Sequence, residues 1–129
     1  MVDRTLIIDR LKQLGYTATE ADYDHIDYEL QIVINYIKNY CNIITIPEIL
    51  DYRIADRVCA SFLYYKKNSG SLDGFNYDTV IKELKEGDTT VKYAVGQGED
   101  TPENRFDTFV KNLERAFDKW LTPYRRLRW

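Results

Sequence analysis

The stretch that decides the fold runs from residue 20 to residue 40 and reads EADYDHIDYELQIVINYIKNY. Within it, Ile26, Leu30, Val33 and Ile37 recur at steps of three and four residues. That spacing places them on one face of an α-helix, which can then pack into a core. Acidic residues crowd the first turns, where the helix dipole favours negative charge. We predict that residues 20–40 form the clearest helix of the chain.

Two other stretches show the same period of three to four residues. Residues 5–14 place leucines and isoleucines on one stripe, and Gly15 follows in the position of a left-handed helix cap. Another helix is predicted as far as about Lys67. We expect it to open with a capping box, in which the side chains of Thr45 and Glu48 bond to each other's backbone amides.

The last predicted helix begins at Thr101, with Pro102 in its first position, and ends before Pro123. Proline suits the first turn of a helix because its missing N–H is not needed there. Farther along the chain, a proline disfavours helical geometry in the residue before it. The apolar face of this helix is strongly aromatic and consists of Phe106, Phe109, Val110, Leu113, Phe117, Trp120 and Leu121.

Residues 79–95 show a different pattern. Val80 and Leu84 belong to an alternating series, Glu86-Gly87-Asp88 has the composition of a turn, and β-branched residues follow as far as Val95. These are the signals of a β-hairpin. An isolated hairpin is only marginally stable in water, so it must pack on the helices or pair with another chain.

Together these elements predict one domain of mainly α class. We expect a four-helix bundle-like domain over residues 1–123, with a small β-hairpin near 79–95 before the last helix, and an extended C-terminal tail over residues 124–129. A chain of 129 residues can bury a core without metal or disulfide bonds. Cys41 and Cys59 lie in apolar helical patterns, so we expect both to be buried thiols.

Composition narrows the choice of partners. The formal net charge of −3 argues against a general nucleic-acid binder, which carries a basic face. No stretch approaches the length of a membrane span and the first residues lack a signal-peptide pattern, so we expect no membrane partner and folding in a reducing cytoplasm. Eleven tyrosines indicate contact surfaces between proteins, where this side chain concentrates.

The sequence offers few residues for catalysis, metal binding or cofactor binding. His25 is the only histidine, and no serine or cysteine nucleophile has a local signature beside it. The stretch from Asp22 to Asp27 lacks the ligand and glycine spacing of a calcium loop, and Gly96-Gln-Gly98 matches only half of a dinucleotide fingerprint. We therefore expect no enzyme, no cofactor and no metal site. A small hydrolase that uses Asp22, Asp24, His25 and Asp27 is the weakest alternative.

The last six residues differ from everything before them. Three arginines, a leucine and two aromatic residues lie beyond the proline that ends the last helix. Arginine beside aromatic residues is the composition of binding anchors, and guanidinium groups pair well with carboxylates. We interpret this segment as a docking tail made of Tyr124, Arg125, Arg126, Leu127, Arg128 and Trp129.

A helical front half, the turn KEGDTTV at residues 85–91, a Gly-rich loop, an aromatic last helix and the ending YRRLRW resemble the tailed-phage head–tail connector (head-completion adaptor) family. The resemblance implies a structural subunit that forms a dodecameric ring with its own copies beneath the portal protein. It implies that the C-terminal segment holds the portal, while the opposite side receives the next neck or tail-completion protein. Its subunit-facing or channel-facing residues would be Lys85, Glu86, Gly87, Asp88, Gly96 and Gly98.

The resemblance also implies a location in the neck of the virion, after assembly in the host cytoplasm. DNA would pass through the ring without sequence-specific binding, which suits a mildly acidic subunit. A second function remains open on the residues alone. It is a small phage or bacterial regulatory module that binds DNA or protein through its helices and its arginine tail.

Overall fold

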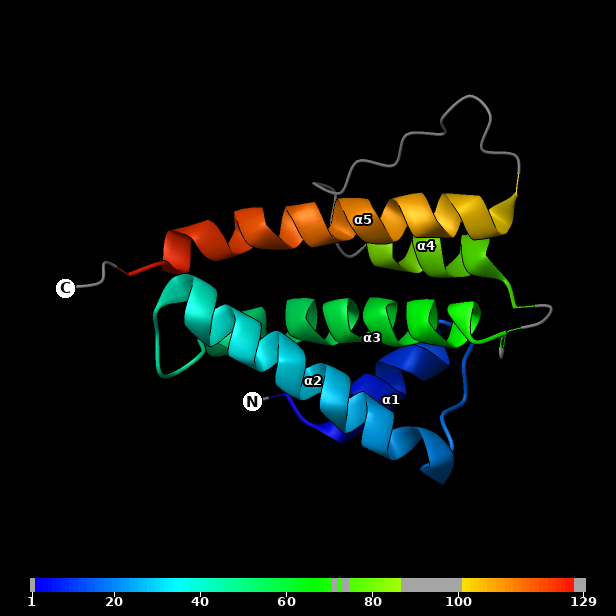
Figure 1. Cartoon of the computed structure of the whole chain (residues 1–129), viewed down its shortest axis with the longest axis horizontal. Coiled ribbons are helices and arrows are strands. Elements are labelled where there is room, and N and C mark those ends of the chain that lie inside the picture. Colours follow the sequence, from blue (N-terminus) through cyan, green and yellow to red (C-terminus); the bar gives the residue numbers. More distant parts are fainter. Residues whose placement is uncertain (1, 71, 73–74, 87–100, 127–129) are drawn as a thin grey trace.

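The computed structural model describes residues 2–70, 72, 75–86 and 101–126 (Figure 1). These residues form five α-helices and two short 3-10 helices, and they contain no strand. The elements in chain order are α1 (Arg4–Gln13), α2 (Glu20–Cys41), η1 (Glu48–Leu50), α3 (Asp51–Asn68), α4 (Tyr77–Glu86), α5 (Pro102–Leu121) and η2 (Thr122–Tyr124). The predicted mainly α class is confirmed, and so are the predicted helices near 5–14, 20–40 and 102–122.

Helix α3 lies in the middle of the molecule. It packs against α1 and α2 on one side and against α5 on the other, while α4 packs along α5 (Figure 1). Val58, Cys59 and Ala60 are completely buried, although consecutive residues of a helix point in different directions. Because α3 buries several faces at once, it fixes where α1, α2 and α5 can lie.

Two of the predicted helix ends are confirmed in detail. Gly15 follows α1 with φ of +95°, a backbone conformation that residues with a Cβ rarely adopt. Thr101 caps α5, because its side-chain oxygen accepts a hydrogen bond of 3.2 Å from the amide of Asn104. Among the described helices, none is both long enough and apolar enough to cross a membrane.

The capping box predicted at Thr45 is wrong. The chain enters α3 through the 3-10 turn η1, whose cap residue is Pro47 in an extended conformation, and no side chain caps this turn. A helix that opened at Thr45 would need Ile46 in helical geometry, which the following proline disfavours. A capping box stands instead at the start of α2, where the amide of Thr19 donates to Asp22 over 3.1 Å.

The β-hairpin predicted near residues 79–95 is wrong in its first arm, because Tyr77–Glu86 form the helix α4. Val80, Ile81 and Leu84 are all buried, whereas Lys82 is exposed. A strand would have placed Ile81 on the face opposite Val80 and Leu84, so only a helix buries all three side chains on one face. The turn and the second arm lie outside the described residues.

Two contacts missed by the sequence reading explain why this segment is helical. The side chain of Asn76 accepts a hydrogen bond of 3.1 Å from the amide of Thr79 and so caps the first turn. Tyr77 then lies against Phe106 of α5, with ring centroids 5.1 Å apart. The bundle therefore has five helices in its described part, not four, because α4 takes the place of a strand.

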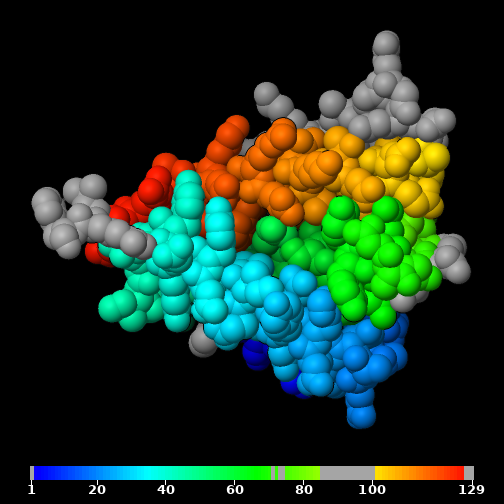
Figure 2. Space-filling view, viewed as in Figure 1, coloured from blue at the N-terminus to red at the C-terminus, as the bar shows by residue number. Residues whose placement is uncertain are grey.

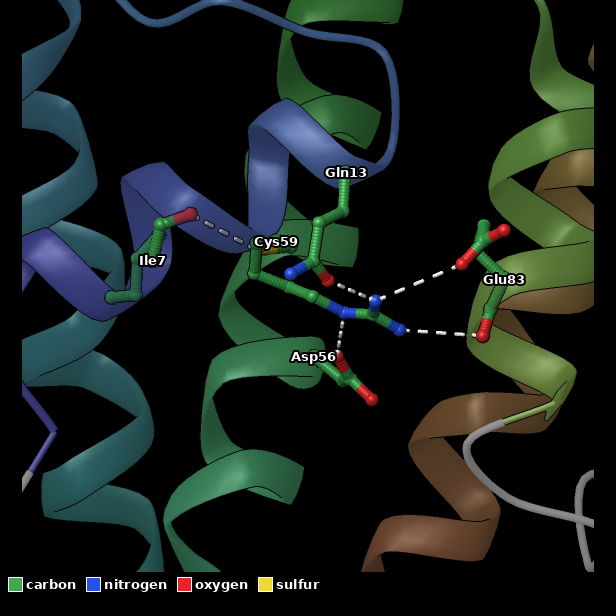
Figure 3. A network of polar contacts seen from close by, with 6 residues as sticks. Ile7, Gln13, Asp56, Cys59 and Glu83 are labelled. Atoms are coloured by element: carbon green, nitrogen blue, oxygen red, sulfur yellow. Dashed lines mark hydrogen bonds and ion pairs between the residues drawn. The ribbon is translucent and has the colours of Figure 1, made fainter.

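A polar network ties α1 to α3 and α4 (Figure 3). The guanidinium group of Arg10 donates to Asp56 over 2.7 Å, to Gln13 over 2.8 Å and to the backbone oxygen of Glu83 over 3.3 Å. Close by, the thiol of Cys59 donates to the oxygen of Ile7 over 3.7 Å. The side chain of Arg10 is only 18% exposed, so this network satisfies a charge that would otherwise be costly to bury.

The helical assignment of α4 leads to a stability prediction. Ile81→Ala should lower the free energy of unfolding by about 2–4 kcal/mol, because Ile81 is a core residue that would leave a cavity. Lys82→Ala at the neighbouring exposed position should change it by less than about 0.5 kcal/mol. Urea unfolding followed by circular dichroism measures both values. Equal, small effects at the two positions would contradict the burial of Ile81 described here.

Candidate docking site

The chain leaves helical geometry within a few residues of the end of α5. The hydroxyl of Thr122 donates to the backbone oxygen of Asp118 over 3.0 Å, which closes the last turn of the helix. Pro123 lies within the 3-10 turn η2, and the amide of Arg125 donates back to the oxygen of Thr122 over 3.2 Å. Arg125 itself is extended. The predicted stop at Pro123 is confirmed, because α5 ends at Leu121 and the backbone is extended by Arg125.

The first residues of the docking tail lie against the C-terminal end of α2. The amide of Arg126 donates to the backbone oxygen of Cys41 over 2.7 Å. The guanidinium group of Arg125 lies over the ring of Tyr40, 4.7 Å from its centre. Tyr124 is partly buried and packs on the core. These three contacts form what we call the tail root.

The tail root joins the ends of two helices in a reciprocal way. The last carbonyl groups of a helix have no partner within it, and the Arg126 amide supplies one for Cys41 of α2. In return, the Cys41 thiol donates to the backbone oxygen of Leu121 in the last turn of α5 over 3.5 Å. Burial raises the pKa of this thiol, with a smaller opposing effect of Arg125, so the thiol keeps the proton it donates.

An open hollow of about 350 Å³ lies beside the tail root. Its walls come from the connection between α2 and η1 and from the chain after α5, namely Ile43, Thr45, Pro47, Pro123, Tyr124, Arg125 and Arg126. Ile44, next to this wall, is 89% exposed. An exposed large apolar side chain beside two arginines is the kind of surface that protein partners cover.

The structure brings together only some of the residues predicted as a site. Tyr124, Arg125 and Arg126 meet at the end of the molecule where α2 and α5 finish (Figure 1). Leu127, Arg128 and Trp129 lie outside the described residues. The second predicted group does not join them. Lys85 and Glu86 are the last residues of α4, a helix farther back along α5, and Gly87, Asp88, Gly96 and Gly98 lie outside the described residues.

Sequence reasoning missed other exposed apolar residues. Ile49 is 73% exposed and Tyr52 is 76% exposed at the start of the segment that leads into α3. Next to them, the guanidinium group of Arg53 lies 4.0 Å from the centre of the Trp120 ring. A signal for Ile49 is present in the sequence, because residues 42–49 read NIITIPEI and carry four isoleucines that fit no helical stripe.

The acidic stretch at the start of α2 serves the fold. Asp22 is buried and accepts hydrogen bonds from the hydroxyl of Tyr16 at 2.7 Å, from the amide of Thr19 at 3.1 Å and from Lys66 at 3.2 Å. Asp27 is paired with Arg4 of α1. Within the described part of the chain, no cluster of histidine, cysteine and acidic side chains could hold a metal ion.

His25 also has a place in packing. Its ring lies 4.0 Å from that of Tyr65 and 5.6 Å from that of Phe62, so it bridges α2 and α3. Its Nε2 atom has Glu29 of the next turn at 3.4 Å. The four residues of the hydrolase alternative therefore do not converge, because Asp22 and Asp27 point to separate partners on α3 and α1.

Comparison with protein-family models, curated proteins and solved structures finds no match for this chain. The tail root, the neighbouring hollow and the exposed isoleucine beside them are therefore interpreted from their own chemistry.

The contacts of Asp22 give a prediction for stability. Asp22→Ala should lower the free energy of unfolding by about 2–4 kcal/mol, because it removes a buried carboxylate and leaves the half-buried donors of Tyr16 and Lys66 without this acceptor. Asp24→Ala, an exposed position on the same helix, should change it by less than about 0.5 kcal/mol. Denaturant unfolding at neutral pH measures the two variants. A similar loss in the free energy of unfolding for both variants would contradict a stabilising role of the Asp22 contacts.

The same residue gives a prediction for pH. Burial alone would raise the pKa of Asp22, but the hydrogen bonds from Tyr16, Thr19 and Lys66 outweigh it and hold the pKa below its ordinary value of 3.8. A carboxyl group whose pKa is lower in the folded protein stabilises the fold fully at pH values above its pKa in the unfolded chain. This stabilisation is lost as the pH falls through its pKa in the folded protein. The difference in the free energy of unfolding between the native chain and Asp22→Asn should therefore shrink as the pH falls from the unfolded-chain pKa of Asp22 through its folded-state pKa. A constant difference down to acid unfolding would contradict the lowered pKa.

Proposed function

We propose that this chain is a structural head–tail connector subunit of a tailed phage, which binds the portal protein through its C-terminal tail. The observation that carries the proposal is the tail root. Arg125 and Arg126 are fixed to the end of α2, so the residues that follow start from a defined point at one end of a helical domain. The residues that follow are Leu127, Arg128 and Trp129.

A fixed root favours docking for an energetic reason. Binding costs free energy for each chain segment that it orders, and preorganised segments reduce that cost. Here the backbone is already held at Arg126, so a partner need not order the chain up to that point before it meets Leu127, Arg128 and Trp129. Those residues include a tryptophan and an arginine, the side chains that most often dominate binding energy at interfaces.

The proposal includes the other partners expected from the resemblance. Copies of the chain would form a ring, dodecameric in the family it resembles, and the side away from the portal would meet the next neck or tail-completion protein. The segment from Lys85 to Gly98 would face neighbouring copies or the channel, with its beginning helical rather than extended. The subunit would work in the neck of the virion, after assembly in the host cytoplasm.

The proposal also states what the subunit does not do. DNA would pass through the ring without sequence-specific binding, and a formal charge of −3 would keep phosphates from adhering to the wall. We propose that the chain catalyses no reaction. The acidic residues at the start of α2 support this, since Asp22 and Asp27 are already engaged in contacts that hold α2 to α3 and α1.

Removal of residues 127–129 tests the tail. We expect the truncated chain to keep the unfolding midpoint of the full chain, because the tail root remains. It should lose co-purification with the portal protein encoded in the same phage genome. The double variant Arg128→Ala with Trp129→Ala should behave in the same way, and Lys12→Ala, at an exposed position on α1, serves as the control. Retention of the portal by a folded, truncated chain would overturn the proposal.

A further inference from the structure

The outward face of α5 carries a stripe of positive charge. Lys111, Arg115 and Lys119 are exposed and spaced by four residues, so they follow one another along the side of the helix away from Phe109 and Leu113 in the core. No ion pair joins any of the three to another described residue. We call these three residues the basic stripe.

The outward face of α2 carries a stripe of a different kind. Its residues are also spaced by four, beginning with the exposed acids Glu20 and Asp24 and continuing with Tyr28, Ile32 and Tyr36, which are 61%, 44% and 42% exposed. Large apolar side chains rarely gather on a surface that stays in water. We call these five residues the acidic-aromatic stripe.

The two stripes belong to neighbouring helices. The hydroxyl of Tyr36 donates to Asp118 of α5, and a hollow of about 210 Å³ lies between Ile32 and Tyr36 on one side and Glu114 and Asp118 on the other. Both helices contribute to the face of the molecule shown in Figure 2. Arg57 also lines this hollow and pairs with Glu114 over 3.4 Å, so the chain already places an arginine, with its apolar stem and charged end, beside these carboxylates and apolar side chains.

We propose that the basic stripe of one copy binds the acidic-aromatic stripe of another copy of this chain. The inference rests on the proposed connector function and names the contact through which copies associate. Charge complementarity carries it. None of the three outward-facing cations on α5 forms an ion pair with another described residue, and α2 presents acids followed by aromatic rings at the same spacing of four.

The chain already uses this chemistry inside its own fold. Guanidinium groups lie over aromatic rings in the pairs Arg4–Tyr23 at 4.8 Å and Arg53–Trp120 at 4.0 Å. Both pairs join different helices. Arg115 over Tyr28 or Tyr36 of a second copy would repeat the same contact between molecules.

The contact joins two different surfaces, so each copy can bind one neighbour through its basic stripe and a second neighbour through its acidic-aromatic stripe. A contact of this kind can continue from copy to copy, and it closes into a ring when the rotation between copies allows.

A polyanion is a poorer occupant of the basic stripe. Glu114 and Asp118 border it on the same helix and would repel phosphate groups, and the whole chain is acidic.

Paired charge reversal tests the inference with the chain alone. Lys111→Glu with Arg115→Glu should weaken self-association roughly tenfold or more, because acids would then face acids. Glu20→Lys with Asp24→Lys should weaken it as much, because bases would face bases. An equimolar mixture of the two variants restores opposite charges at every contact and should regain association. Sedimentation equilibrium at low salt, up to millimolar protein, measures all three samples.

The control variant, Lys12→Glu with Lys82→Glu, makes the same change in net charge at exposed positions elsewhere and should associate like the native chain. Circular dichroism verifies that each variant is folded.

A native chain that stays monomeric throughout, or a mixture that fails to regain association, would overturn the inference. Loss of binding to duplex DNA in the α5 variant, with self-association unchanged, would overturn it in favour of a nucleic-acid surface. None of these results bears on the portal assay of the tail, so the two proposals can fail separately.

Discussion

The burial of α3 on several sides is the constraint on which the rest of the structure depends. Val58, Cys59 and Phe62 have no exposed surface, so α1, α2 and α5 must all press against this one helix. Each fully buried side chain of this size contributes about 1.5–3 kcal/mol relative to an exposed one. Once α2 and α5 are both seated on α3, their C-terminal ends arrive at the same end of the molecule.

That meeting of helix ends produces the tail root. The carbonyl of Cys41 and the carbonyl of Leu121 each belong to the last turn of a helix, and each obtains a donor from the other segment. A docking tail thus begins from a backbone that the fold has already ordered. The link between core packing and the proposed function is therefore direct, because the position of the tail depends on where α2 and α5 end.

The sequence predicted those helices whose apolar residues repeat over a long stretch. Residues 20–40 are an example, since five turns leave no doubt about the period. It failed at α4, where ten residues carry both an alternating and a helical pattern, and where the contact of Tyr77 with Phe106 of α5 decides. It failed at Thr45 because Pro47 disfavours the helical geometry that Ile46 would need there.

The candidate site was only partly predictable for the same physical reason. The composition of residues 124–129 marked them as unusual, but nothing local could show that Arg126 bonds to Cys41. Contacts between residues so distant in sequence depend on the assembled fold. The stripes on α2 and α5 could have been found from spacing alone. Composition alone, such as the count of eleven tyrosines, does not place a residue on a helix face.

The most direct test of the account is electron cryomicroscopy of this chain bound to the portal protein encoded with it. The account predicts a closed ring of copies on the portal, with residues 124–129 of each copy in contact with portal density and α2 and α5 ending next to that contact. A complex without a ring, or a ring whose residues 124–129 point away from a portal held by other helices, would contradict it.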